Sequence, residues 1–305
     1  MASSEQTDRP RLDELVTEGR LPQTADYDEL TTRELVELVN REDASVPAAV
    51  AAARDELAAA LDAIVDRLRD GGRLVYAGAG TSGRLAELDA SECESTFSSE
   101  PGRVVALVAG AGLPSAAHRD AAEDDPQAGA DAVRAIDVSD HDAVVGVSAS
   151  GRTPFVVGAL EAAAAEGALT VCIVSTPDSE LARIAQHTIA VVVGPEVISG
   201  STRLKAGTAQ KLVLNAISTI SMVRLGKTYG DLMVDVAGAN EKQRARARRA
   251  VRLATGADDG EVDEALAAAG GSAKVAIVSL LAGVDTDTAR ARLGESAGSV
   301  RGALQ

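Results

Sequence analysis

Five short apolar runs of strand length lie between residues 73 and 194, and they constrain the fold more than any other feature. Helical patterns separate most of these runs, and the runs begin at Leu74, Val104, Ala143, Thr170 and Thr188. Strands that are apolar on both faces and alternate with helices are typical of parallel sheets that helices cover on both sides. We therefore predict an α/β domain with a doubly wound, parallel, five-stranded sheet in a flavodoxin-like order.

The segments around this sheet have helical patterns. Apolar residues recur at helical spacing in residues 45–70 and 201–225, and the chain after residue 238 has no strand pattern. We predict an N-terminal helical segment at residues 1–44, the sheet domain at 45–238 and a small helical module at 239–305. The basic run at residues 242–249 could be a nucleic-acid patch, but the acidic segments on either side favour a solvated helix face.

The composition excludes several classes of partner. A formal net charge of -16 opposes binding to nucleic acids and to anionic membranes, and aromatic residues make up only 2% of the chain. Cys93 and Cys172 are far apart, and the three histidines are scattered, so we expect neither a disulfide nor a metal site. No apolar run reaches the roughly 18 to 20 residues of a membrane span, and the N-terminus has no apolar signal core. We expect a soluble, cytoplasmic protein.

A glycine-rich loop follows the first predicted strand. Residues 78–83, GAGTSG, fit the pattern G-x-G-x-x-G, which is also the fingerprint of dinucleotide-binding loops. That fingerprint needs an acidic residue at the end of the next strand, for the ribose hydroxyls. The next run, from Val104, leads into AGAGL and has none. This absence argues against a nicotinamide-dependent dehydrogenase and favours a phosphate site at Gly80, Thr81 and Ser82.

A second loop, Ser148-Ala149-Ser150-Gly151-Arg152-Thr153, lies between a strand and a helix. Hydroxyl groups and backbone amides at a helix N-terminus form an anion site. A single hydroxyl would be explained by helix capping, which is common. Three hydroxyls in six residues exceed what a cap needs, so we assign phosphate binding to Ser148, Ser150, Gly151 and Thr153.

A third polar stretch, GSTRLKAGT, adds Ser201, Thr202 and Lys205 as candidate phosphate ligands. Two interpretations remain open for this stretch. It is either a contact with the substrate or the capped start of a buried helix.

The pattern S-x-S-G-x-T after a strand, preceded by a G-x-G-T-S loop, resembles the sugar isomerase (SIS) family of phosphosugar-binding domains. Longer segments, including GAGTSGRLAELDASECESTF, VVGVSASGRTPFVVGALE and GKTYGDLMVDVAGANEK, are similar to the N-acetylmuramic acid 6-phosphate etherase family. The chain departs from that family's pattern at Glu87, Glu94 and Ser95. The resemblance implies a SIS fold and a carbon–oxygen lyase that acts in cell-wall amino-sugar recycling or catabolism, with no cofactor.

That family is understood to convert N-acetylmuramic acid 6-phosphate to N-acetylglucosamine 6-phosphate and D-lactate by elimination and hydration. The resemblance assigns proton donation to Glu92 and the second acid/base role to Glu123. It also implies a homodimer. The alternative is a non-catalytic, phosphosugar-binding regulatory protein of the SIS family, which would not need two acid/base carboxylates.

Overall fold

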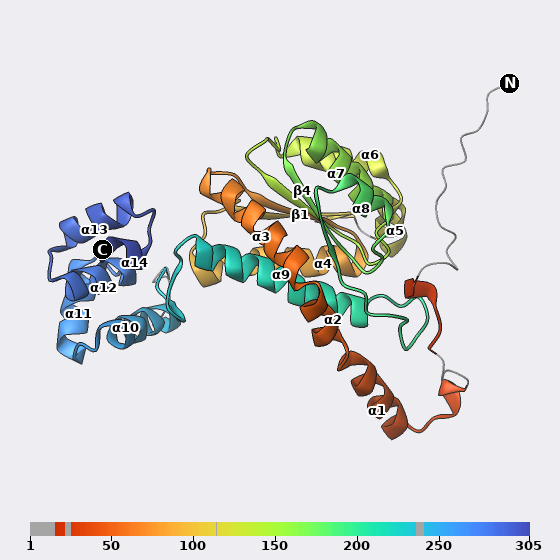
Figure 1. Ribbon diagram of the computed structural model, residues 1–305, viewed down its shortest axis with the longest axis horizontal. Coiled ribbons are helices and arrows are strands. Elements are labelled where there is room, and N and C mark those ends of the chain that lie inside the picture. Colours follow the sequence, from red (N-terminus) through yellow and green to blue (C-terminus); the bar gives the residue numbers. More distant parts are fainter. Residues whose placement is uncertain (1–15, 22–25, 114, 236–240) are drawn as a thin grey trace. The chain divides into compact units, whose positions relative to one another are not determined.

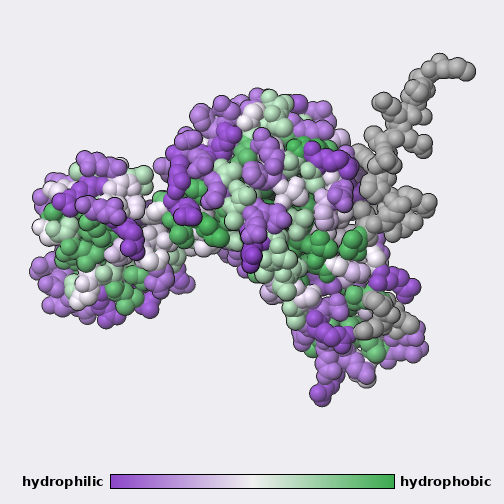
Figure 2. Space-filling view, in the orientation of Figure 1, coloured by the Kyte–Doolittle hydropathy of each residue, from purple (hydrophilic) through white to green (hydrophobic). Residues whose placement is uncertain are grey.

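The computed structural model describes residues 16–21, 26–113, 115–235 and 241–305. The chain forms two compact units. Of the described residues, the first unit contains those up to 88 together with those of 105–216, and the second contains those of 89–104 together with those of 217–305. The division into segments 1–44, 45–238 and 239–305 stays a prediction. The face shown in Figure 2 carries many hydrophilic residues in each unit, and smaller hydrophobic patches lie among those residues.

The first unit is built around a five-stranded sheet with the order β2-β1-β3-β4-β5, which confirms the predicted flavodoxin-like order. Neighbouring strands from β1 to β5 pair in parallel, with Leu74 opposite Ala143 and Val171 opposite His187. Every residue of β1, β3 and β4 is buried, which explains why their sequences are almost entirely apolar. The strands are β1 (Leu74–Gly78), β2 (Val104–Val108), β3 (Ala143–Val147), β4 (Leu169–Val174) and β5 (His187–Ala190).

Helices cover both faces of this sheet (Figure 1). Helix α7 (Pro154–Ala165) packs against β1, β3 and β4. It also packs against α6 (Pro126–Ala135) and α8 (Glu180–Ile184). Helix α3 (Arg54–Arg69) packs against β3, β4 and β5. Helix α7 is apolar on nearly all sides because it is buried between the sheet and its neighbours. Its Phe155 and Leu160 are in the same core cluster as Val144 and Cys172.

Several helices differ in detail from their predicted extents. The helix predicted at residues 45–70 is in fact two helices, α2 (Val46–Ala52) and α3, which are separated at Ala53. The helix predicted at residues 201–225 is α9 (Lys205–Arg224). Helix α1 (Thr32–Asp43) begins with a capping box, in which Thr31 and Glu34 satisfy each other's backbone N–H groups. The remaining helices of this region are η2 (Val16–Glu18), η3 (Tyr27–Glu29), α4 (Gly80–Phe97) and α5 (Ala116–Glu123).

The second unit contains the predicted C-terminal helices, preceded by a two-stranded hairpin that the sequence did not predict. The hairpin pairs β6 (Thr228–Tyr229) with β7 (Leu232–Met233). In the basic run, Arg248 forms ion pairs with Asp259 and Asp263, as expected for a solvated helix face. The helices are α10 (Glu241–Thr255), α11 (Asp259–Ala268), α12 (Ala273–Ala282), α13 (Thr286–Glu295) and α14 (Val300–Ala303).

Within the described residues, no single helix has both the length and the apolar character needed to cross a membrane. Helices α11 and α12 satisfy those criteria only when taken together, and the chain bends by 116° between them.

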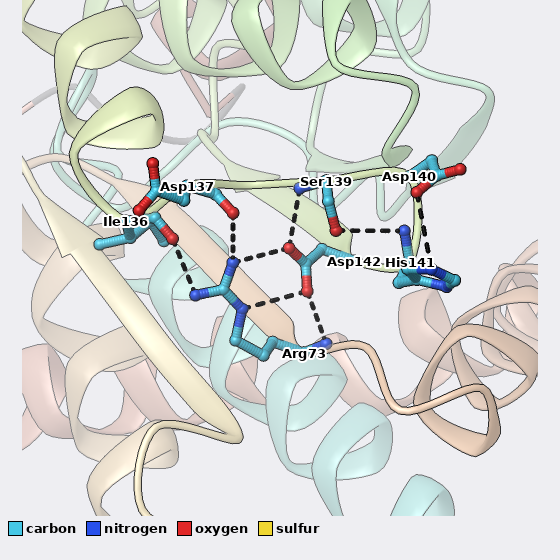
Figure 3. A network of polar contacts seen from close by, with 7 residues as sticks. All are labelled: Arg73, Ile136, Asp137, Ser139, Asp140, His141 and Asp142. Carbon is cyan, nitrogen blue, oxygen red and sulfur yellow. Dashed lines mark hydrogen bonds and ion pairs between the residues drawn. The ribbon is translucent and has the colours of Figure 1, made fainter.

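A polar network fixes the amino ends of β1 and β3 (Figure 3). The guanidinium of Arg73 donates two hydrogen bonds to Asp142, at 3.1 and 2.7 Å, and others to the carbonyls of Ile136 and Asp137. The backbone N–H groups of Arg73 and Ser139 also donate to Asp142. Burial opposes ionisation of Asp142, but these hydrogen bonds outweigh burial and lower the pKa of its carboxyl. The network therefore holds together the two strands whose opposite ends lead into the predicted phosphate loops.

Candidate functional site

A cavity of about 500 Å³ lies in the first unit, where β1 and β3 end. From β1 the chain passes to β2 on one side, whereas β3 pairs with β1 on the other side. The cavity is therefore at the topological switch point, where α/β sheets bind ligands. Seven of the predicted phosphate-site residues line it: Gly80, Thr81, Ser82, Ser148, Ser150, Thr153 and Thr202.

The first glycine loop combines close packing with a left-handed turn. Gly80 has a φ of 53°, which favours glycine, and it starts α4. A Cβ atom added to Gly83 would lie 2.8 Å from the carbonyl oxygen of Gly78 and 2.8 Å from a methyl group of Val108. The glycines let α4 begin directly against the sheet, with its N-terminal residues at the cavity. Such a helix N-terminus favours an anion.

The second loop holds its hydroxyl groups together. Ser148 and Thr153 are buried, and their hydroxyl oxygens lie 2.8 Å apart. The N–H of Gly151 donates to the Ser148 hydroxyl at 3.1 Å, and the φ of Gly151 is 66°. Thr153 is the N-cap residue of α7, but its side chain makes no capping hydrogen bond to the described residues. Capping therefore does not account for these hydroxyls, which favours the phosphate interpretation over the cap.

The third stretch is largely the start of a helix. The buried carboxylate of Glu196 accepts hydrogen bonds from the N–H groups of Lys205 and Ala206, at 2.9 and 3.0 Å, and so caps α9. The amine of Lys205 lies 2.9 Å from a carboxylate oxygen of Glu42, and its side chain is only 3% exposed. Thr202 lines the cavity, whereas Gly151, Ser201 and Lys205 are not among its described lining residues. Their role as phosphate ligands stays a prediction, and the structure gives Lys205 a different partner.

Of the two predicted catalytic carboxyls, Glu123 lies in this cavity. Glu123 is the last residue of α5. Its Oε2 atom lies 3.7 Å from the position that a Cβ atom added to Gly80 would occupy. Burial raises the pKa of Glu123, and the negative charges of Asp124 and Asp120 raise it further. A carboxyl with a raised pKa is a stronger base and is suited to proton transfer near neutral pH.

Glu92 is exposed on α4 and is not among the described residues that line this cavity. Its backbone carbonyl accepts a hydrogen bond from the Ser95 hydroxyl. The assignment of Glu92 as proton donor stays a prediction.

The cavity also contains functional candidates that the sequence did not identify, among them Glu18 and Arg152. Arg152 lies inside the second loop, and its guanidinium is a natural partner for phosphate, so the motif itself could have indicated it. Glu18 ends η2, whose backbone is held by hydrogen bonds from Ser199 and Gly200. No local pattern connects Glu18 with residues so distant in the sequence.

The first unit, a doubly wound sheet with a hydroxyl-lined cavity at its switch point, is assigned to the SIS-type domains by two family models. The SIS domain family matches residues 126–220, and the glucokinase regulatory protein N-terminal SIS domain family matches residues 56–164. A solved structure of a phosphoheptose isomerase from Francisella tularensis is similar in fold. Its TM-score is 0.50 at 18% identity, and the match covers 64% of this chain and 100% of the isomerase.

Sequence relatives narrow this class. A protein of Rubrobacter xylanophilus is 59% identical over 294 residues, covering 96% of this chain and 97% of its own length. A protein of Streptomyces avermitilis is 56% identical, covering 96% and 94%. Both are named N-acetylmuramic acid 6-phosphate etherase. The chain therefore belongs to the N-acetylmuramic acid 6-phosphate etherase family, which confirms the resemblance seen in its motifs.

Proposed function

We propose that this protein cleaves the D-lactyl ether of N-acetylmuramic acid 6-phosphate and releases N-acetylglucosamine 6-phosphate and D-lactate. The supporting observation is that one cavity contains both a hydroxyl-rich helix N-terminus and Glu123, a half-buried carboxyl with a raised pKa. The first feature suits a phosphate group, and the second suits proton transfer. A protein that only bound a phosphosugar would need the first feature alone.

The 6-phosphate is proposed to bind between the two loops. Hydroxyl groups come from two places. The start of α4 supplies those of Thr81 and Ser82, and the loop before α7 supplies those of Ser148, Ser150 and Thr153. The N-termini of both helices add a favourable field for the anion. These contacts overcome the repulsion expected from a protein with a net charge of -16.

The bond that breaks joins C3 of the sugar to the ether oxygen. In the ring-opened aldehyde, the hydrogen at C2 is acidic because it is next to a carbonyl group. Removal of that proton forms the C2–C3 double bond and expels the lactyl oxygen, which takes a proton as it leaves with D-lactate. Water then adds its oxygen to C3, and a proton returns to C2.

Each proton transfer needs a side chain that accepts or donates the proton. Glu123, with its raised pKa, is proposed to move the proton at C2. Glu92 is proposed to protonate the departing ether oxygen, a role that its family resemblance assigns. No electron transfer takes place, because elimination and hydration leave the overall oxidation state unchanged.

The assembly proposed for this enzyme is a homodimer. Apolar side chains are exposed in the first unit, including Val36 at 54% and Val39 at 37% on α1 and Ile198 at 58%. Burial of such side chains against a second copy would be favourable. Light scattering after size-exclusion chromatography should give twice the chain's mass of 31.0 kDa. A monomer at micromolar concentration would contradict this part of the proposal.

A cytoplasmic location is proposed because a charged sugar phosphate does not cross a membrane unaided. Fractionation of the producing cells should recover the protein with the cytoplasmic fraction. Recovery outside the cytoplasm would contradict this location.

Incubation of the purified protein with N-acetylmuramic acid 6-phosphate, followed by an enzymatic assay for D-lactate, tests the activity. The wild-type protein should release D-lactate, whereas Glu123→Gln should bind the phosphosugar and release very little. Binding without lactate release by the wild-type protein would instead favour the regulatory alternative.

A further inference from the structure

A buried glutamine lies behind the first phosphate loop. Gln210 is on α9 and is only 2% exposed. The hydroxyl of Ser82 donates a hydrogen bond of 2.9 Å to its Oε1 atom. The Nε2 atom of Gln210 is buried and forms no hydrogen bond to any residue that the structure describes. A buried amide nitrogen without an acceptor is unfavourable, so this arrangement calls for a physical reason.

The contact between α9 and the start of α4 is close. A Cβ atom added to Gly207 would lie 3.5 Å from a methyl group of Thr81 and 4.0 Å from Leu85. Gly207 on α9 therefore faces Thr81 and Leu85 of α4 across a distance that leaves room only for ordinary van der Waals contact. The Gln210 amide has little freedom to move away from Ser82, but it can turn over in place because its oxygen and nitrogen have nearly the same size.

The direction of the hydrogen bond determines what Ser82 can offer a ligand. A serine hydroxyl has one proton and two lone pairs. While that proton goes to Gln210, Ser82 presents only lone pairs to the cavity, and these repel phosphate oxygens. An amide that donates to Ser82 would instead free the serine proton for the phosphate.

We propose that Gln210 is a positioning residue for phosphate binding, and that its amide turns over when a phosphosugar binds. In the bound state Nε2 donates to the Ser82 hydroxyl, and Ser82 donates its proton to the phosphate. The turn moves the unpartnered position from the amide nitrogen to the amide oxygen, so the gain is the charge-assisted hydrogen bond from Ser82 to the phosphate, which is stronger than a neutral one. This inference rests on the proposed role of Ser82 as a phosphate contact.

A double-mutant cycle tests the coupling between the two residues. The variants are Ser82→Ala, Gln210→Met and the double variant, and the probe is N-acetylglucosamine 6-phosphate, titrated by calorimetry. Ser82→Ala should raise Kd by about 10-fold or more, since it removes a hydrogen bond to a charged group. Gln210→Met should raise Kd by a smaller factor, because the serine hydroxyl remains but is no longer oriented. The double variant should bind no more weakly than Ser82→Ala.

Steady-state kinetics with N-acetylmuramic acid 6-phosphate provide a second readout. Gln210→Met should raise KM and leave kcat within a few-fold, because the phosphate contact is the same in the ground and transition states. Gln210→Leu serves as a second variant if methionine packs poorly. Gln186→Met is the matched control: the Gln186 side chain also accepts a hydrogen bond inside the first unit, from the Thr170 backbone, and it does not line the cavity. The control should change thermal stability but not Kd.

Additive effects of the two single variants, or wild-type affinity of both Gln210 variants, would overturn the proposal. Wild-type affinity of Ser82→Ala would also overturn it, by removing the phosphate contact on which it rests. Lactate release by the wild-type protein is measured separately, so a failure of this coupling can be told apart from a failure of the proposed function.

Discussion

Removal of the two serine hydroxyls of the second loop should weaken substrate binding far more than it slows the reaction. Ser148 and Ser150 both line the cavity, and each is proposed to donate a hydrogen bond to the 6-phosphate. A hydrogen bond to a charged group contributes about 1.5 to 3 kcal/mol. At the lower limit, two such bonds give about 3 kcal/mol, which corresponds to an increase of about 100-fold in KM. The double variant Ser148→Ala with Ser150→Ala should show that increase with kcat within a few-fold of wild type.

The fold should tolerate this change. The N–H of Gly151 donates to the Ser148 hydroxyl, but it also lies 3.3 Å from the Ser148 backbone carbonyl and so keeps an acceptor. We expect a stability loss of about 1 kcal/mol. Ser139→Ala is the matched control, because Ser139 lies before the amino end of β3 whereas Ser148 follows its carboxyl end. Unchanged KM in a folded double variant would refute the phosphate assignment, since the hydroxyls would then serve only the loop.

Three further predictions concern the carboxyl groups. Glu92→Gln should lower kcat by roughly 100- to 10,000-fold while calorimetry shows unchanged affinity for N-acetylglucosamine 6-phosphate, and near wild-type lactate release would remove Glu92 from the mechanism. Asp120→Asn should move the acidic limb of the pH profile of kcat/KM to lower pH, because the substitution removes a negative charge that raises the pKa of Glu123. If the acidic limb does not move at low salt, Glu123 is excluded as the base. The lowered pKa of Asp142 means that its stabilising effect is present above the unfolded value of about 4 and is lost as pH falls through the folded value. Asp142→Asn should therefore lower Tm at neutral pH and reduce the further fall of Tm as the pH is lowered. If Tm falls with pH as steeply in the variant as in the wild type, the stabilising role of the Asp142 carboxylate is contradicted.

The sheet was predictable because its strands are buried on both faces. Residues 74–78, 143–147 and 169–174 are almost entirely apolar, with Thr170 as a polar exception, so strand length and helical separation were enough to indicate the parallel order. The hairpin at residues 228–233 was missed because each of its strands has only two residues, too few to show any alternation. The break at Ala53 was missed because an alanine-rich stretch continues the helical pattern across it.

The site was predictable where its residues are adjacent in the sequence. The two loops at residues 78–83 and 148–153 carry their hydroxyls and glycines in short motifs, and the cavity contains most of them. Glu18 and Gln210 were missed because only the tertiary fold brings them to these loops. The ion pair between Lys205 and Glu42 was not predictable, because Glu42 is too distant in the sequence to be recognised as a partner. The assignment of Lys205 as a phosphate ligand stays a prediction.

The most direct test of the central claim is to run the reaction with N-acetylmuramic acid 6-phosphate in ¹⁸O-labelled water and, separately, in deuterated water. Elimination followed by hydration predicts ¹⁸O at the C3 hydroxyl of N-acetylglucosamine 6-phosphate, no label in the lactate hydroxyl, and deuterium at C2. Mass spectrometry of both products reads these labels. Label in the lactate hydroxyl with no deuterium at C2 would mean direct hydrolysis on the lactyl side, and it would contradict the proposed roles of Glu123 and Glu92.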